Sequence, residues 1–182
     1  MQRMLTAGLF HSIDGVVEAP NEWQFDAFDA NLGKMLGEIM GRVDTVILGC
    51  VGYEQWASYW PSATADKGFG DFINSVPKHV ASRTLKGNLA WNNSMLIDGD
   101  VERFVLDLKS GGEISVMASI TLVRQFFLSG VLDELTLITH PVIAGAGKRH
   151  LFQPGDPTTR LDLVRSVQTS KGNIVSTYRV RK

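Results

Sequence analysis

Cys50 is the only cysteine of the chain, and it lies in the stretch ILGCVGYEQW, residues 47–56. A cysteine becomes a nucleophile when a neighbouring base takes its proton. The four histidines are scattered along the chain, and their spacing does not indicate a Cys–His pair. A thiol enzyme is therefore the least favoured hypothesis. A single cysteine also excludes an internal disulfide and any multi-cysteine zinc or iron–sulfur site.

Two groups of polar residues each follow a short apolar run. The first is Ser12-Ile13-Asp14-Gly15, in which Asp14 either places a carboxylate beside a substrate or forms an ordinary turn with Gly15. The second is Ser82-Arg83-Thr84, where a guanidinium between two hydroxyls suits a phosphate group. The alternative for this second group is a solvated loop arginine.

Small residues near the fifth expected strand are candidates for a phosphate site. Gly111-Gly112 precedes this strand, and Ala118-Ser119-Ile120 leads from it into a helix. Small residues let backbone N–H groups approach a phosphate, and a helix N-terminus favours an anion. The alternative is that these residues only end one helix and begin the next. The chain lacks a complete G-x-G-x-x-G, so the pattern alone favours this alternative.

Charge and composition limit the kinds of molecule that the protein is expected to bind. The net charge is -1, with no basic block, which argues against binding nucleic acid or a membrane surface through bulk charge. The histidines have no ligand spacing, so we expect no metal site. No apolar run is long enough for a signal peptide or a membrane span. We therefore expect a cytoplasmic enzyme or small-ligand binder.

Strands alternate with helices over most of the sequence. We expect strands over residues 4–10, 45–48, 78–82, 114–117, 135–142, 161–169 and 174–180, with short extended pieces over 89–91 and 95–97. We expect helices over residues 25–40, 53–60, 69–76, 101–108 and 120–128. This alternation predicts one α/β domain, residues 1–182, with a mainly parallel sheet and a C-terminal antiparallel hairpin.

The order of these motifs resembles that of the dihydrofolate-reductase-like family, which includes the reductase domain of bacterial riboflavin biosynthesis. SIDG, ILGCVGYEQW, VASRTL and LKSGGEISVMAS follow successive strands or lead into them, and the resemblance runs from about Met4 to Tyr178. Its most specific piece is VLDELTLITHPVIAGAGKRHLF, residues 131–152. The resemblance implies a three-layer α/β/α domain that binds NADPH, or NADH, at the carboxyl ends of its strands. It also implies hydride transfer to a pyrimidine or pterin-like substrate, and a homodimer.

The resemblance also implies roles for individual residues. Asp14 would be catalytic, and Ser12 and Trp23 would contact the substrate; Trp23 would otherwise only pack against the start of the first helix. The residues implied to line the cofactor are Gly15, Gly49, Cys50, Tyr53, Ser82, Arg83, Thr84, Gly111, Gly112, Ala118, Ser119 and Ile120. Protein chemistry in such a site is largely positioning, because the cofactor carries the hydride.

Several positions depart from the pattern of this family. Cys50 stands where the family commonly has arginine, and Gly52 where it has threonine. Ala118 replaces a glycine, and Ser110 stands where the riboflavin reductases tend to carry glutamate. A neutral thiol cannot replace a guanidinium at a phosphate. A second hypothesis is therefore a binding module of the same fold that has lost catalysis.

Overall fold

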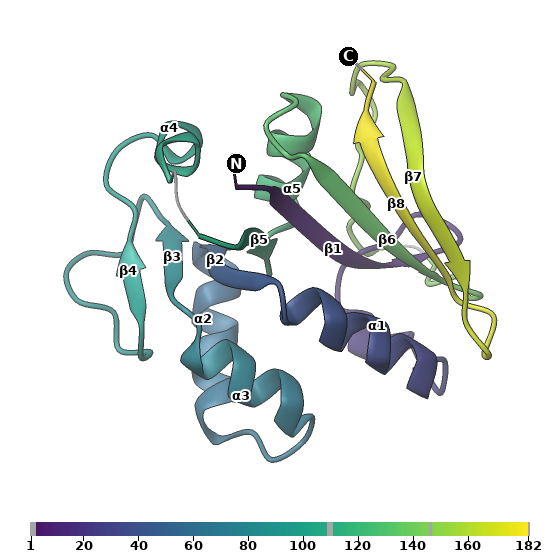
Figure 1. Ribbon diagram of the computed structural model, residues 1–182, viewed down its shortest axis with the longest axis horizontal. Coiled ribbons are helices and arrows are strands. Elements are labelled where there is room, and N and C mark those ends of the chain that lie inside the picture. Colours follow the sequence, from purple (N-terminus) through teal and green to yellow (C-terminus); the bar gives the residue numbers. More distant parts are fainter. Residues whose placement is uncertain (1–2, 109–110, 146, 182) are drawn as a thin grey trace. The chain divides into compact units, whose positions relative to one another are not determined.

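The computed structural model describes residues 3–108, 111–145 and 147–181 (Figure 1). Ser110, one of the departures from the family pattern, lies outside these residues. The chain divides into two compact units by its internal contacts. The first comprises Met1–Leu5 and Ile39–Ser119, and the second comprises Thr6–Glu38 and Ile120–Lys182. The expectation of a single domain stays a prediction.

The described part of the first unit contains four parallel strands. Their order is β4 (Ser94–Leu96), β3 (Lys78–Ala81), β2 (Val43–Gly49) and β5 (Glu113–Met117). The helical segments are α2 (Cys50–Tyr59), the short 3-10 turn η2 (Trp60–Ser62), α3 (Lys67–Ser75) and α4 (Val101–Asp107). In Figure 1, α2 and α3 lie on one side of these strands and α4 lies on the other.

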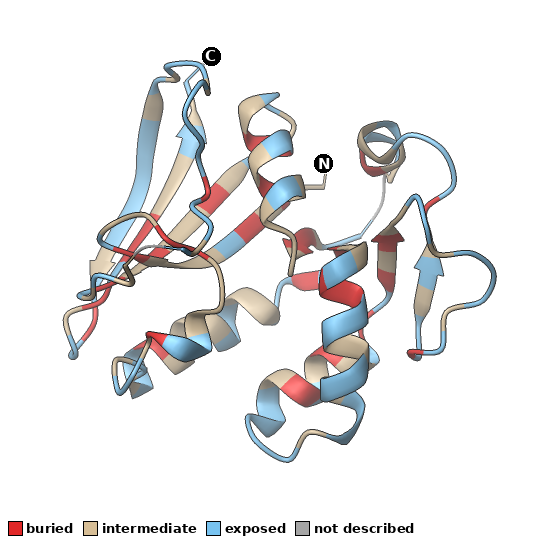
Figure 2. Ribbon diagram, turned by 180° about the vertical axis from the view of Figure 1, so that it is seen from behind, coloured by how far each residue is buried: buried red, intermediate tan, exposed pale blue. Residues whose placement is uncertain are grey.

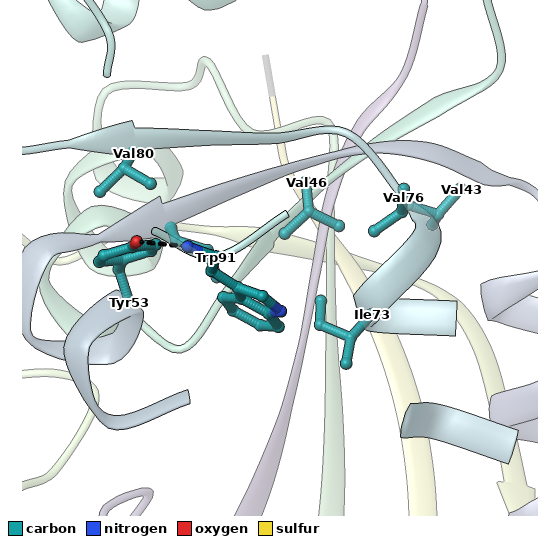
Figure 3. Close-up of a cluster of buried hydrophobic side chains, with 8 residues drawn as sticks. Val43, Val46, Tyr53, Ile73, Val76, Val80 and Trp91 are labelled. Atoms are coloured by element: carbon teal, nitrogen blue, oxygen red, sulfur yellow. Dashed lines mark hydrogen bonds between the residues drawn. The ribbon is translucent and has the colours of Figure 1, made fainter. Parts of the chain in front are cut away.

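Alternating side chains of β2 and β3 build the core of this unit. Val46 and Val80 point toward α2 and α3, where they meet Ile73 (Figure 3). The residue before Val80 in β3, His79, lies on the opposite face and packs against Phe104 of α4, with ring centroids 4.9 Å apart. Each fully buried valine or isoleucine contributes about 1.5–3 kcal/mol relative to an exposed one. These contacts fix where the carboxyl ends of the strands lie.

Lys78 is fully buried at the start of β3 and has a structural role. Its ammonium donates hydrogen bonds to the carbonyls of Ile73 (2.8 Å) and Val76 (2.9 Å), at the carboxyl end of α3. It also lies 4.6 Å from the centre of the Trp91 ring. Burial lowers the pKa of Lys78 to about 8. A cation at this end of a helix offsets the helix dipole, so these contacts account for the buried charge.

The second unit combines parallel and antiparallel pairing. β1 (Leu5–Ser12) pairs parallel with β6 (Glu134–His140), which pairs antiparallel with β8 (Ile174–Val180), and β8 pairs antiparallel with β7 (Leu161–Gln168). The helical segments are the 3-10 turn η1 (Pro20–Glu22), α1 (Ala30–Met40) and α5 (Ile120–Leu128). The predicted fold class is confirmed, because the strands are mainly parallel and the C-terminal hairpin is present.

β7 is largely exposed, as the pale blue strand beside β8 in Figure 2 shows. In the described part of the chain, its ladder partner is β8 alone. A register shift between Leu163 and Arg165 marks a bulge in this strand. Bulges are one way in which edge strands limit pairing with other chains. The homodimer implied by the family resemblance stays a prediction.

The predicted first helix is wrong at its start. α1 begins at Ala30, whereas the apolar spacing had indicated residue 25. Phe25 has a positive φ of 46° and is 80% exposed, so it precedes the helix. Asp29 ends this segment, because its carboxylate accepts a hydrogen bond from the backbone N–H of Leu32 (2.8 Å) in the manner of a helix cap. The extended piece expected over residues 89–91 is also not a strand.

The carboxylate of Asp29 makes the stability of the second unit sensitive to acid. Burial alone would raise its pKa, but hydrogen bonds from the N–H of Leu32, from Thr169 and from the N–H of Lys171 outweigh burial and lower it to about 2. A depressed pKa stabilises the fold above the ordinary value of 3.8, and this contribution is lost as the pH falls toward 2. We therefore expect Asp29→Asn to lower the melting temperature at pH 6, and the difference from the unsubstituted chain to narrow between pH 3.8 and pH 2. Melting curves across this range measure it, and a constant difference would contradict the assignment.

Candidate functional site

The carboxyl ends of β2 and β3 bring three of the predicted cofactor residues together. Gly49 and Ala81 are register partners, so the residues that follow them lie side by side. Cys50 Sγ lies 3.5 Å from Thr84 Oγ1, which in turn lies 3.4 Å from Ser82 Oγ. This contact places a neutral hydroxyl beside the thiol of Cys50. A neutral hydroxyl is not the base that a nucleophilic cysteine needs.

A tight turn presents Arg83 beyond this group. Ser82 Oγ accepts hydrogen bonds from the backbone N–H groups of Thr84 (3.1 Å) and Leu85 (2.9 Å). Arg83 lies between them and is exposed. Among the described residues, its guanidinium has no hydrogen bond or ion pair. An unpaired guanidinium at a strand end is available for an anionic group such as a phosphate.

The turn from β2 into α2 packs directly against the turn that follows β5. A Cβ added at Gly49 would lie 2.6 Å from Ser119 Oγ, so the glycine permits a close approach of the serine hydroxyl. Gly49 is also the N-cap residue of α2, and as a glycine it has no side chain with which to cap this helix start. The first N–H groups of a helix favour an anion when no side chain satisfies them. This combination of small residues and a helix start at a glycine fits the phosphates of a dinucleotide.

A second glycine, Gly52 within α2, approaches the turn after β5 even more closely. A Cβ added there would lie 1.9 Å from the carbonyl oxygen of Ala118 and 2.6 Å from its Cβ. The backbones of the two turns therefore touch, and the position tolerates only glycine. Gly52 and Ala118 both depart from the family pattern, and the structure places these two departures in direct contact.

Ala118 has a positive φ of 48°, a conformation that costs an L-residue roughly 1–2 kcal/mol. We expect Ala118→Gly to stabilise the chain by about 0.5–1 kcal/mol, because glycine relieves this strain but loses more freedom on folding. Urea unfolding measures the change. The matched control is Ala57→Gly within α2, where the same substitution is expected to cost about 1 kcal/mol. Equal destabilisation by both substitutions would contradict the strained backbone at Ala118.

Gly111 and Gly112 do not belong to this group of residues. They precede β5, whereas Ala118 and Ser119 follow it, so the two pairs lie at opposite ends of one strand. The N–H of Gly112 donates to Asp44 Oδ2, and its carbonyl accepts a hydrogen bond from Arg3 Nε (2.9 Å). The expectation that this glycine pair lines the same pyrophosphate as Ala118 and Ser119 is corrected accordingly. A glycine pair is not specific to phosphate sites, and here Gly112 joins the start of β5 to Asp44 and Arg3.

Tyr53 is part of the core. Its side chain is 6% exposed, and its hydroxyl accepts a hydrogen bond from the backbone N–H of Trp91 at 3.2 Å (Figure 3). The predicted contact of the Tyr53 side chain with the cofactor is therefore corrected, because α2 begins at Cys50 and directs Tyr53 inward. Ile120 is the first residue of α5 and belongs to the second unit, and its predicted contact with the cofactor stays a prediction.

Asp14 and Ser12 form a hydrogen-bonded group in the second unit. Asp14 Oδ1 accepts from the hydroxyl of Ser12 (2.6 Å) and the N–H of Ala144 (2.9 Å), and Oδ2 accepts from the N–H of Gly145 (2.9 Å). These donors, the Ser12 hydroxyl first, hold the pKa of Asp14 well below its ordinary value. The carboxylate stays charged near neutral pH and fixes the loop that follows β6. Gly15 completes the turn with a positive φ of 89°.

Trp23 is 3% exposed, which favours the packing alternative over a stacking contact with a ligand. Its indole N–H donates to the carbonyl of Glu18 (2.8 Å), and its ring meets His140 edge-on. His140 is fully buried, with Nδ1 2.5 Å from Asn173 Oδ1 and Nε2 3.1 Å from Gln24 Nε2. Burial lowers the pKa of His140 and outweighs the opposing effect of Asn173.

The sequence analysis missed this buried polar group. The amide N of Asn173 donates to the carbonyl of Ala27 and to Thr169 Oγ1, so its oxygen must accept from His140. His140 is therefore neutral with its proton on Nδ1, and Nε2 accepts from Gln24. A histidine as the last residue of a buried strand was the available signal. Its partner Asn173 comes from the β7–β8 turn and its partner Gln24 from the segment after η1, so neither could be found from spacing.

The described residues support neither a metal site nor a membrane-spanning helix. Their acidic, histidine and cysteine side chains form no group of three that could hold a metal ion. None of the described helices has the length and apolar character needed to cross a membrane.

Comparison with known proteins gives a family and a fold. A family model described as the RibD C-terminal domain matches residues 3–175. The uncharacterized protein YyaP of Bacillus subtilis (strain 168) is 27% identical over 183 residues, which covers 97% of this chain and 95% of YyaP. A putative riboflavin biosynthesis protein from Shewanella sp. PV-4 has a TM-score of 0.76 at 18% identity, with 100% of both chains covered.

Two further solved structures share the fold at low identity. One is a diaminohydroxyphosphoribosylaminopyrimidine deaminase/5-amino-6-(5-phosphoribosylamino)uracil reductase from Thermotoga maritima. Its TM-score is 0.70 at 12% identity, and the match covers 99% of this chain and 57% of that one. The other is dihydrofolate reductase from Enterococcus faecalis in complex with NADP(H). Its TM-score is 0.65 at 14% identity, with 100% of this chain and 99% of that one covered.

Proposed function

The chain belongs to the RibD C-terminal domain family, and on this premise we propose that it is an NADPH-dependent reductase. The proposed substrate is a heterocycle of the pyrimidine or pterin class. The names of the Thermotoga and Enterococcus proteins support this class, since one reduces an aminouracil and the other is a dihydrofolate reductase bound to NADP(H). Family membership supports an oxidoreductase.

The arrangement around the start of α2 carries the proposal within this chain. The helix start at Gly49, the close approach of Ser119 to this glycine and the guanidinium of Arg83, which has no partner among the described residues, all suit phosphate groups. In the proposed complex, Gly49 and Ser119 hold the pyrophosphate and Arg83 holds the 2′-phosphate of the adenosine. Cys50 and Thr84 line the same strand ends as neutral groups. When bound, the cofactor supplies the hydride.

Asp14 acts in this proposal as a positioning residue. Its carboxylate is held by three hydrogen bonds and stays charged near neutral pH, so it does not donate a proton there. It instead holds the backbone of Ala144 and Gly145 beside the SIDG turn. Substrate orientation by Ser12, the neighbouring turn and this loop follows from that rigidity.

A second candidate function is a dinucleotide- or small-ligand-binding module without catalysis. The contact between Gly52 and Ala118 favours it, because backbone atoms there occupy space at the turn proposed to hold the pyrophosphate. The neutral thiol of Cys50 in place of an arginine favours it as well.

Measuring turnover distinguishes a reductase from a binding module without catalysis. We expect the purified chain to oxidise NADPH when 5-amino-6-(5-phosphoribosylamino)uracil or dihydrofolate is added, as followed by the loss of reduced-nicotinamide absorbance. NADPH binding without oxidation in the presence of either compound would support the binding module. Absence of both binding and oxidation would contradict the proposed reductase.

A further inference from the structure

Two histidine rings converge on the turn that follows β1. A Cβ added at Gly15 would lie 3.1 Å from His150 Cδ2 and 4.0 Å from His150 Nε2. The same point lies 4.0 Å from His11 Nε2. Both rings therefore present the same kind of nitrogen to one position, directly beside Asp14. The backbone bridge between Val16 and His150 brings these distant parts of the sequence together.

The Nε2 atoms of both rings are available for a ligand. His11 uses its other ring nitrogen, because Nδ1 lies 3.2 Å from Thr139 Oγ1 on the neighbouring strand β6. Within residues 3–108, 111–145 and 147–181, neither Nε2 atom has a hydrogen-bond partner. His11 is half-buried and His150 is exposed, so the pair lies at the surface of the second unit.

The other charged side chains beside His150 are already engaged. Lys148 forms an ion pair with Glu22, and the guanidinium of Arg149 donates to Thr121 Oγ1 at 3.1 Å. The backbone N–H of Arg149 donates to Glu18 Oε2 at 3.0 Å. In the segment Lys148-Arg149-His150, the imidazole is thus the side chain left without a partner among the described residues.

The groups around His11 determine how readily its ring takes up a proton. Burial lowers the pKa of His11, the Asp14 carboxylate raises it, and a charge on His150 lowers it. Burial is the largest of these effects, and the charge on His150 adds to it in opposing protonation of His11. Asp14 is fixed in its charged form by its three donors. Imidazole is the kind of side chain that exchanges a proton in the physiological range, so the histidine rings rather than Asp14 are the candidates for proton transfer here.

We propose that His11 and His150 supply the proton that accompanies hydride transfer, with Asp14 as a positioning residue in the turn that both rings face. This inference rests on the proposed reductase function. Addition of a hydride to the carbon of a C=O or C=N bond places an electron pair on the oxygen or nitrogen. The imidazolium N–H bond breaks, an O–H or N–H bond forms on the substrate, and the neutral imidazole then takes a proton from water. The site accordingly suits a substrate reduced at a polarised double bond.

Histidine ring NMR on the whole chain tests the coupling without any added ligand. The chain has four histidines, and the His11 and His150 signals are assigned with the His11→Gln and His150→Gln variants. We expect His150→Gln to raise the pKa of His11, because it removes the repelling charge. We expect Asp14→Asn to lower it. A His11 titration that neither substitution changes would overturn the proposed group.

Turnover of the added uracil or pterin substrate tests the chemistry. We expect His150→Gln and His11→Gln to lower kcat by about a hundredfold, as for loss of a general acid, and to leave NADPH affinity and the melting temperature unchanged. The matched control is His79→Gln on β3, whose ring packs on Phe104 and which is expected to keep the unsubstituted kcat and pH profile. Unchanged kcat in both His11 and His150 variants would overturn this inference and leave the reductase standing. Failure of the unsubstituted chain to bind NADPH would overturn both.

Discussion

Gly52→Ala is expected to destabilise the chain by about 2–3 kcal/mol, although alanine is the better helix former. The added Cβ would lie 1.9 Å from the carbonyl oxygen of Ala118, and backbone atoms cannot move away as a flexible side chain can. The midpoint of urea unfolding measures this cost. Threonine, the residue common in the family at this position, is expected to cost more because its side chain is larger and branched.

Gly37→Ala in α1 is the matched control for this substitution. A Cβ at Gly37 meets no atom within 4 Å, so we expect it to stabilise the chain by about 0.5–1 kcal/mol. Combining Gly52→Ala with Ala118→Gly should recover only part of the loss, since the carbonyl oxygen at position 118 remains in place. Similar unfolding midpoints for the Gly52 and Gly37 variants would contradict the contact between the two turns.

Arg83→Ala is expected to weaken NADPH binding by ~1.5–3 kcal/mol, the range for one lost charge-assisted hydrogen bond. NADH lacks the 2′-phosphate, so its affinity should change little. Competitive titration of the two dinucleotides measures the change in preference. Arg103→Ala is the matched control, because Arg103 is also an exposed arginine of the first unit but pairs with Asp107.

Cys50→Arg is the complementary test to Arg83→Ala, because it adds a positive charge instead of removing one. A guanidinium beside Thr84 and Arg83 should raise NADPH affinity more than NADH affinity. Equal losses of both dinucleotides in Arg83→Ala would reject the assignment of this residue to the 2′-phosphate. They would point instead to a general effect on the turn held by Ser82.

Periodicity predicted most of the strands and helices, because the buried faces of this chain follow regular apolar spacing. It failed at the start of α1, where Phe25 and Phe28 continue the helical spacing but precede the cap at Asp29. A local hydrogen bond to the backbone decides this boundary, and an apolar stripe carries no information about it. Similarly, Gly111-Gly112 has the composition of a phosphate turn but lies at the amino end of β5.

The candidate site could be predicted only where neighbouring strands end together. Cys50, Ser82 and Thr84 each follow a strand, and parallel pairing of β2 with β3 makes them neighbours. The convergence of His11 and His150 depends on a contact between segments far apart in sequence, which no spacing reveals. Close approaches such as that of Gly52 to Ala118 likewise appear only when the backbone paths are known.

Binding of NADPH tests the central claim most directly. The chain contains four tryptophans, so energy transfer from indole to the reduced nicotinamide reports binding without any substrate. We expect a saturable signal with NADPH that Arg83→Ala weakens and Arg103→Ala leaves unchanged. The absence of a saturable signal with both NADPH and NADH, from a chain whose melting curve shows it to be folded, would contradict the account.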